Sequence, residues 1–342
     1  MSERHQTIAT IELAANHLGD VLTHCFEHNQ GHTAVVVYDS GSPLAITLTA
    51  AYRLALPDAR FIDFDASTPE AVLAILAPLV KADLVVLVQS TSFRMDAFRI
   101  RVELFKRELK VIEHPHLARM KGEEARYYID ALAYDPAYYR GLGNALKTLI
   151  DAAGGGVVDS GGERLVFASP FESAKLNVGD YREMTNIGGQ FPIGEVFTEA
   201  KDLLAVNGRV RIFVFGDTAF EVNRPAKPIT LVVTNGQVTN VIDSTEEFDR
   251  VIASIKEVEG VVWLRELGFG MNRAFNKDRT VSDIGTFERM CGIHLSLGAK
   301  HGIYGKPGFK RGDGKFHVDV FAVTESVMLD TREVYRDGAW VV

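Results

Sequence analysis

The chain has 342 residues, 46% of them hydrophobic and 24% charged, which is more than one compact core usually needs. Its formal net charge of -8 comes without a basic run that could follow a phosphate backbone, so we expect no nucleic-acid partner. Cys25 and Cys291 lie far apart, which excludes a disulfide framework and a thiolate metal site.

The sequence shows no targeting or membrane-spanning pattern. Its first thirty residues lack a charged start followed by an unbroken apolar stretch, and no run near 18 apolar residues occurs later. We therefore expect a cytoplasmic protein without a membrane partner.

The N-terminal half alternates between helix and strand patterns. Apolar residues recur at steps of three and four from Ile8 to Cys25, which predicts a helix ending near Gly31. Short β-branched runs follow at residues 33–38, 60–64, 84–88 and 109–113. Helical segments between them begin at Ser42-Pro43 and Thr68-Pro69. This alternation predicts a mostly parallel sheet covered by helices on both faces.

The pattern changes near residue 154. Residues 119–153 are expected to be helical and end in Gly154-Gly155-Gly156, after which strands and turns dominate. Asn235-Gly236 predicts a hairpin between residues 229–234 and 237–242, and Asp337-Gly338 predicts another. A helix is expected at residues 245–258. We expect an α/β N-terminal domain at 1–153, then an α+β domain at 154–342 with a mainly antiparallel sheet that carries a metal site.

Four short motifs carry residues that can bind metal. In His317-Val318-Asp319, a strand would point both polar side chains to one face, where they can share an ion. His294, Glu266 and Glu195 each lie in an apolar stretch, where a polar group needs a partner. Taken singly, each motif is weak, because an ordinary ion pair or hydrogen bond explains it.

Together these carboxylates and imidazoles suit zinc, cobalt, manganese or iron, and we expect one or two divalent ions. Instead of binding metal, Glu266 could form an ion pair with Arg265 or Arg273. His114 and His116 follow a strand at a place where α/β sheets often bind ligands, but Pro115 also makes this an ordinary loop.

The motifs resemble the successive metal motifs of the aminopeptidase T family of metallopeptidases, which is related in fold to 2,5-dihydroxypyridine dioxygenases. They are Gly194-Glu195-Val196-Phe197-Thr198, Glu266-Leu267-Gly268-Phe269-Gly270, His294-Leu295-Ser296-Leu297-Gly298 and His317-Val318-Asp319. The resemblance covers residues 186–320 and implies a homodimer with a two-metal site. The implied ligands are Glu195, Glu266, His294, His317 and Asp319.

One position departs from the family pattern. The family places a tyrosine seven residues after the histidine of the third motif, whereas this chain has His301 there. We expect His301 to act as a metal ligand or as a donor to the transition state, and an uninvolved loop histidine is the remaining alternative. The expected catalytic residues are therefore Glu266 and His301, and His301 joins the expected metal ligands.

The resemblance implies hydrolysis of an N-terminal residue or small amide by metal-activated water, with a small molecule or short peptide as substrate. An iron-dependent ring-opening dioxygenase that acts on a hydroxylated pyridine is the alternative. Such enzymes use two histidines and one carboxylate, and look to have histidine where this chain has Glu266. A non-catalytic, metal-stabilised dimer is the third hypothesis.

Overall fold

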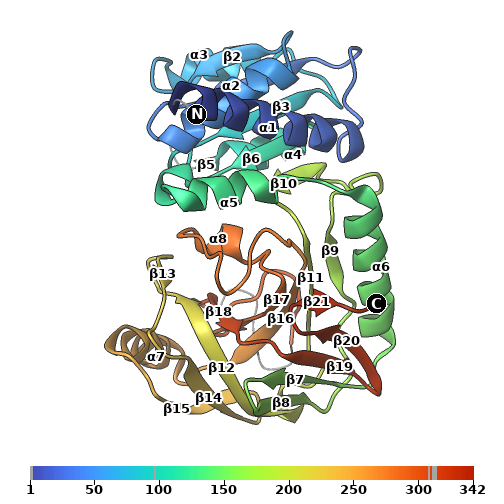
Figure 1. Cartoon of the computed structure of the whole chain (residues 1–342), viewed down its shortest axis with the longest axis vertical. Coiled ribbons are helices and arrows are strands. Elements are labelled where there is room, and N and C mark those ends of the chain that lie inside the picture. Colours follow the sequence, from blue (N-terminus) through green and yellow to red (C-terminus); the bar gives the residue numbers. More distant parts are fainter. Residues whose placement is uncertain (1–2, 96–97, 307–308, 310–313) are drawn as a thin grey trace. The chain divides into compact units, whose positions relative to one another are not determined.

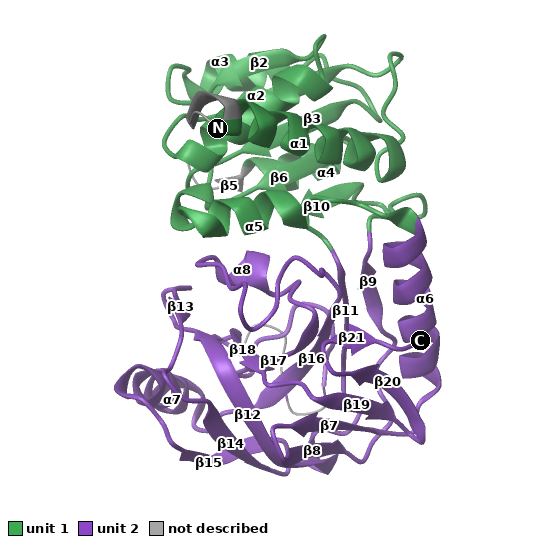
Figure 2. Cartoon of the chain, in the orientation of Figure 1, with its two compact units in different colours: residues 1–136, 179–193 green, residues 137–178, 194–342 purple. Residues whose placement is uncertain are grey.

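The computed structural model describes residues 3–95, 98–306, 309 and 314–342 (Figure 1). The chain forms two compact units (Figure 2). Unit 1 comprises Met1–Pro136 and Gly179–Ile193, and unit 2 comprises Ala137–Val178 and Gly194–Val342. The domain boundary expected at residues 153–154 falls inside unit 2, because nearly all of α6 (Pro136–Ala152) belongs to that unit. The helix is attached to the rest of unit 2 by Lys147, whose Nζ donates to the Ala174 carbonyl at 2.8 Å.

Unit 1 contains a five-stranded sheet in the order β10-β6-β3-β1-β2, and its strands pair in parallel. The strands are β1 (Ala34–Tyr38), β2 (Arg60–Asp63), β3 (Leu84–Val88), β6 (Lys110–His114) and β10 (Gly188–Gln190). The helices are α1 (Glu3–His24), α2 (Pro43–Ala55), α3 (Pro69–Leu76), α4 (Ile100–Lys106) and α5 (Glu123–Ala131). A short ribbon of β4 (Arg94–Met95) and β5 (Phe98–Arg99) and the 3-10 turn η1 (Leu117–Arg119) complete the described elements.

The sheet of unit 1 is buried on both faces, as its β-branched runs predict. On one face, Val35 of β1 and Val85 of β3 pack with residues of α3 and α4. The alternate residues Val36 and Val86 point to the other face and are fully buried, and α2 contacts both strands. Helices α2 and α3 begin where expected, because Ser42 and Thr68 cap their first turns and a proline follows each cap.

His114 is a structural residue of unit 1. Its two ring nitrogens lie 2.7 Å from the hydroxyls of Tyr52 and Tyr128, and burial lowers its pKa to about 3. His114 is the last residue of β6, and its side chain therefore belongs to the hydrogen-bonded interior of unit 1. His116 has a left-handed backbone and lies 2.7 Å from the Ser92 hydroxyl.

Unit 2 contains a 14-stranded sheet whose main path runs β21-β20-β19-β7-β8-β12-β18-β17-β16-β11-β9. Off this path, β13 and β14 pair with β12, and β15 pairs with β14. The outer strands are β7 (Gly156–Ser160), β8 (Glu163–Phe167), β9 (Lys175–Asn177), β13 (Val222–Asn223), β14 (Ile229–Thr234), β15 (Gln237–Ile242), β19 (Ser326–Leu329), β20 (Arg332–Arg336) and β21 (Ala339–Trp340). The central strands are β11 (Glu195–Glu199), β12 (Val206–Gly216), β16 (Leu264–Gly270), β17 (Gly292–Leu297) and β18 (Val318–Ala322). The described pairings are antiparallel, so the expected fold class is confirmed.

Local chemistry explains the ends of these elements. Asn235 and Gly236 both have positive φ in the turn between β14 and β15, as the hairpin prediction requires, and Asp337 and Gly338 do the same between β20 and β21. Helix α7 (Glu246–Glu259) begins after the cap residue Thr245. The remaining short helices are η2 (Leu203–Ala205) and α8 (Ile284–Phe287).

Within the part of the chain that the structure describes, no helix is both long and apolar enough to cross a membrane.

Candidate metal centre

Four neighbouring strands of unit 2 deliver the expected ligands. Glu195 opens β11, Glu266 lies in β16, His294 lies in β17 and Asp319 lies in β18. Because paired strands run roughly 5 Å apart, these side chains meet although they are distant in sequence. His317 directly precedes β18, and its Nε2 lies 3.1 Å from Asp319 Oδ1, so both side chains share one face as predicted.

A β-bulge shapes the β16 position. Leu264 pairs with Leu297 and Leu267 pairs with Leu295, so Arg265 and Glu266 together face the single residue Ser296. The bulge removes the Glu266 N–H from the regular ladder, and the Ser296 hydroxyl accepts it at 3.0 Å. Bulges redirect side chains, which accounts for Glu266 pointing to the ligand cluster while Arg265 binds Glu199.

Gly268 makes room for His294. The two residues are cross-strand partners, and a Cβ at position 268 would lie 2.0 Å from the Cε1 atom of the imidazole. Real atoms cannot approach so closely. The imidazole of His294 therefore requires a glycine at position 268.

The ligand atoms of Glu195, Glu266 and His294 lie within 4.8 Å of one another. His294 Nε2 is 3.2 Å from Glu195 Oε1 and 3.5 Å from Glu266 Oε1. The other oxygen of Glu266, Oε2, is 3.0 Å from His301 Nε2. The His301 and His317 rings are 6.2 Å apart, so the structure gathers all six expected site residues in one region of unit 2.

Several of these polar atoms are buried without an aligned hydrogen bond. Among the described residues they include both ring nitrogens of His294, His301 Nε2 and Asp319 Oδ1. The nearby carboxylate oxygens are close enough but are not in the direction of a hydrogen bond. Buried polar atoms nearly always have a partner, so the unpartnered atoms of His294 and Asp319 fit a cation that binds them.

The acids of the cluster raise the pKa values of the neighbouring imidazoles, and the imidazoles lower the pKa of Glu266. Burial alone would lower the pKa of His294, but the Glu195 and Glu266 carboxylates outweigh it and raise the pKa to about 10. Burial would also lower the pKa of His317, but the negative charge of Asp319 helps to raise this pKa to about 10. Burial would raise the pKa of Glu266, yet the three histidines hold it below its usual range. Protons thus balance these carboxylates when no metal is bound.

The sequence motifs missed Glu288 and Arg289. Arg289 Nη1 lies 2.8 Å from Glu195 Oε2 and 2.6 Å from Glu288 Oε2. Burial, reinforced by the negative charge of Asp319, raises the pKa of Glu288 to about 8. The sequence offered one signal, because the charged pair lies between the apolar residues Phe287 and Met290.

Arg265 and Arg273, the two arginines considered as ion-pair partners of Glu266, have other partners in the structure. Arg265 forms a buried ion pair with Glu199, at 3.0 Å from Nη2 to Oε2. Arg273 lies over the Tyr138 ring, 4.0 Å from its centroid. The nearest charged partners of Glu266 are therefore histidines.

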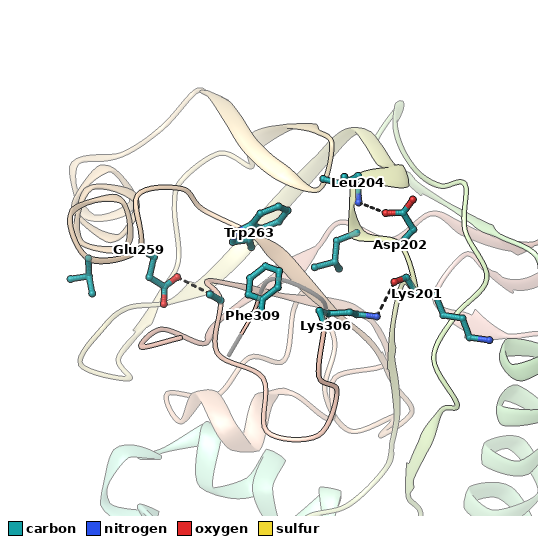
Figure 3. Close-up of a pocket in the computed structure, with 10 residues that line it drawn as sticks. Lys201, Asp202, Leu204, Glu259, Trp263, Lys306 and Phe309 are labelled. Atoms are coloured by element: carbon teal, nitrogen blue, oxygen red, sulfur yellow. Dashed lines mark hydrogen bonds between the residues drawn. The ribbon is translucent and has the colours of Figure 1, made fainter. Parts of the chain in front are cut away.

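A pocket of about 790 Å³ lies elsewhere in unit 2, beside Trp263, Phe309 and Lys306 (Figure 3). None of the described residues that line it is one of the six expected site residues. The chemistry of the side chains, and not cavity volume, therefore locates the candidate site.

Comparison with known proteins finds solved structures of similar fold. No family model and no curated protein matches this chain. Similar solved structures include 2,5-dihydroxypyridine dioxygenase from Pseudomonas putida KT2440, with a TM-score of 0.59, 15% identity and 96% of each chain covered. Wild-type AmpT from Thermus thermophilus has a TM-score of 0.57 and 14% identity, with 97% of this chain and 99% of that chain covered. The likeness shows a shared fold along nearly the whole chain.

We predict that Gly268→Ala lowers zinc affinity by at least about 10-fold, because the added methyl displaces the His294 imidazole. Chelator competition measures the affinity. Gly141→Ala is the matched control, since a Cβ there meets nothing within 4 Å, and it should leave affinity unchanged. Equal affinities in both variants would contradict a ligand role for His294.

We also predict that metal binding releases about two protons at pH 8, because His294 and His317, with pKa values near 10, must become neutral to bind a metal. Apparent affinity should therefore rise with pH up to about 10. Calorimetry in buffers of different ionisation enthalpy counts the protons. His317→Gln should release about one fewer, and metal binding without proton release would refute the prediction.

Proposed function

We propose that this chain is a metal-dependent hydrolase of the aminopeptidase T kind, which cleaves an N-terminal residue or another small amide. The observation that carries the proposal is the position of Glu266, whose two carboxylate oxygens face different histidines, His294 and His301, in a buried cluster. The motif resemblance and the fold likeness to AmpT support it.

The donor set suits one or two divalent ions. Glu195, Glu266 and His294 would hold one ion, and Glu266, His317 and Asp319 would hold a second. Zinc, cobalt, manganese or iron bound there supplies a water of lowered pKa and polarises a carbonyl group. Arg289 keeps Glu195 oriented by binding its Oε2, so that Oε1 faces His294.

Glu266 is the residue that would accept the proton of the attacking water. Its histidine neighbours hold its pKa below the usual range, so its side chain is a carboxylate at neutral pH. The side chain is also buried and is fixed on a strand, which keeps Oε2 in place during proton transfer.

A ring-opening iron dioxygenase is the second candidate. It is favoured by the fold likeness to 2,5-dihydroxypyridine dioxygenase and by the close pair of His317 and Asp319, which needs one more histidine to complete a two-histidine, one-carboxylate set. Glu195 and Glu266 weigh against it, because two further carboxylates would occupy positions that oxygen and substrate need.

We predict that Glu266→Gln keeps the fold and loses about 100-fold or more of the amidase turnover, because the amide has neither the negative charge of a metal ligand nor the basicity of a proton acceptor. Hydrolysis of chromogenic aminoacyl amides, assayed with each metal, measures the effect. Glu257→Gln on the exposed face of α7 is the control and should retain full activity.

Equal amidase activity in Glu266→Gln and the parent would reject the proposal. Iron-dependent oxygen consumption by the parent with a hydroxylated pyridine, in the absence of amidase activity, would establish the dioxygenase instead.

A further inference from the structure

His301 lies in the segment that joins β17 to β18, and both ends of this segment are anchored. One carboxylate oxygen of Glu259, at the end of α7, accepts the Ala299 N–H at 2.7 Å. The other oxygen accepts the Phe316 N–H at 2.9 Å. Between these ends, Lys306 Nζ donates to the Lys201 carbonyl at 3.2 Å; Figure 3 shows Glu259 and Lys306 in these positions. The backbone that carries His301 is therefore held by charged side chains.

The backbone next to His301 determines which ring nitrogen carries the proton. His301 Nδ1 accepts hydrogen bonds from the N–H groups of Ile303, at 3.2 Å, and Tyr304, at 3.3 Å. A backbone N–H can only donate, so Nδ1 must present a lone pair. A neutral imidazole has one N–H, which must then be on Nε2.

The Nε2–H group points into the ligand cluster. Nε2 lies 3.0 Å from Glu266 Oε2 but is not aligned with it, and it has no hydrogen-bond partner among the described residues. Only 2% of the His301 side chain is exposed. A buried donor without an aligned acceptor is available to a substrate atom that enters the site.

We infer that His301 is a hydrogen-bond donor through Nε2–H, not a metal ligand, and that its acceptor is the oxygen of a substrate carbonyl. A protonated ring nitrogen has no lone pair for a metal, so His301 cannot complete a two-histidine, one-carboxylate iron set with His317 and Asp319. The carbonyl assignment rests on the proposed hydrolase function. It narrows the substrates to amides and related acyl compounds, whose oxygen gains negative charge as water attacks.

The nearby tyrosine does not offer this donor. The Tyr304 hydroxyl donates to the Ser173 carbonyl at 2.8 Å and lies 3.3 Å from the Phe197 carbonyl. Its proton is therefore used by the backbone of unit 2. The His301 imidazole, whose ring centroid is 4.9 Å from that of Tyr304, offers a donor beside Glu266 Oε2.

The first test separates metal binding from catalysis. His301→Phe removes the donor, and His301→Gln keeps an N–H. Both should bind as much zinc as the parent, with affinity within about threefold, while kcat on an aminoacyl amide falls about 100-fold in His301→Phe and less in His301→Gln. His317→Gln is the matched control and should lose at least about 10-fold in zinc affinity. Loss of a zinc equivalent in His301→Phe would overturn the inference.

The second test uses the unmodified protein and needs no turnover. In ¹⁵N-labelled protein, with and without zinc, the His301 signals should show an unprotonated Nδ1 and a proton on Nε2. Coupling between Nε2 and bound ¹¹³Cd would show that His301 is a ligand and overturn the donor role. Failure of the parent to hydrolyse any amide would reject the proposed function, while these spectra would still decide which nitrogen carries the proton.

Discussion

Unit 2 must accommodate carboxylates and imidazoles inside a sheet that excludes water. Glu195 and Asp319 are each 5% exposed and His294 is fully buried. An unpaired buried charge costs several kcal/mol, so each of these groups needs an opposite charge nearby. Protons on the histidines supply this balance when no metal is bound, and a divalent ion can replace them. This requirement explains why the acids of β11, β16 and β18 lie beside the imidazole of His294 on β17.

The surrounding structure keeps the cluster in a fixed arrangement. Gly268 leaves space for the imidazole of His294, and the bulge in β16 directs Glu266 toward it. Arg265 is held by Glu199 and also donates to the Ala299 carbonyl at 2.7 Å, which connects β16 to the segment that carries His301. Outer contacts of this kind orient metal ligands, and losing one typically weakens metal binding by about 10- to 100-fold.

Much of the fold could be predicted from the sequence, because the relevant signals are local. β-branched runs, helix caps and the Asn235-Gly236 turn each act within a few residues, and the structure has the corresponding elements. The edge strand β10 could not be predicted in this way. Gly188 lacks a strand pattern, and it pairs with β6 because only glycine fits against the Val111 carbonyl, where a Cβ would lie at 2.0 Å. Such a contact depends on residues far apart in the chain.

The candidate site also combines features that local sequence predicts with features that depend on distant contacts. Glu195, Glu266 and His294 could be recognised as polar residues in apolar stretches, and His317 and Asp319 by their spacing in a strand. His301 could be recognised only through the family resemblance, and all six residues lie together. Glu288 and Arg289 lie outside the four recognised motifs, and their roles depend on the approach of Arg289 to Glu195. The position of the proton on the His301 ring depends on where the N–H groups of Ile303 and Tyr304 point. A sequence pattern does not predict these directions.

Divalent metal binding by this cluster can be seen by anomalous diffraction from zinc-soaked crystals, recorded on both sides of the zinc absorption edge. We expect a peak at roughly 2.0 to 2.2 Å from His294 Nε2 and from a carboxylate oxygen of Glu266. A second peak, if present, should lie near His317 and Asp319. Zinc bound only elsewhere on the protein, with the cluster unchanged, would show that the cluster is not a metal site.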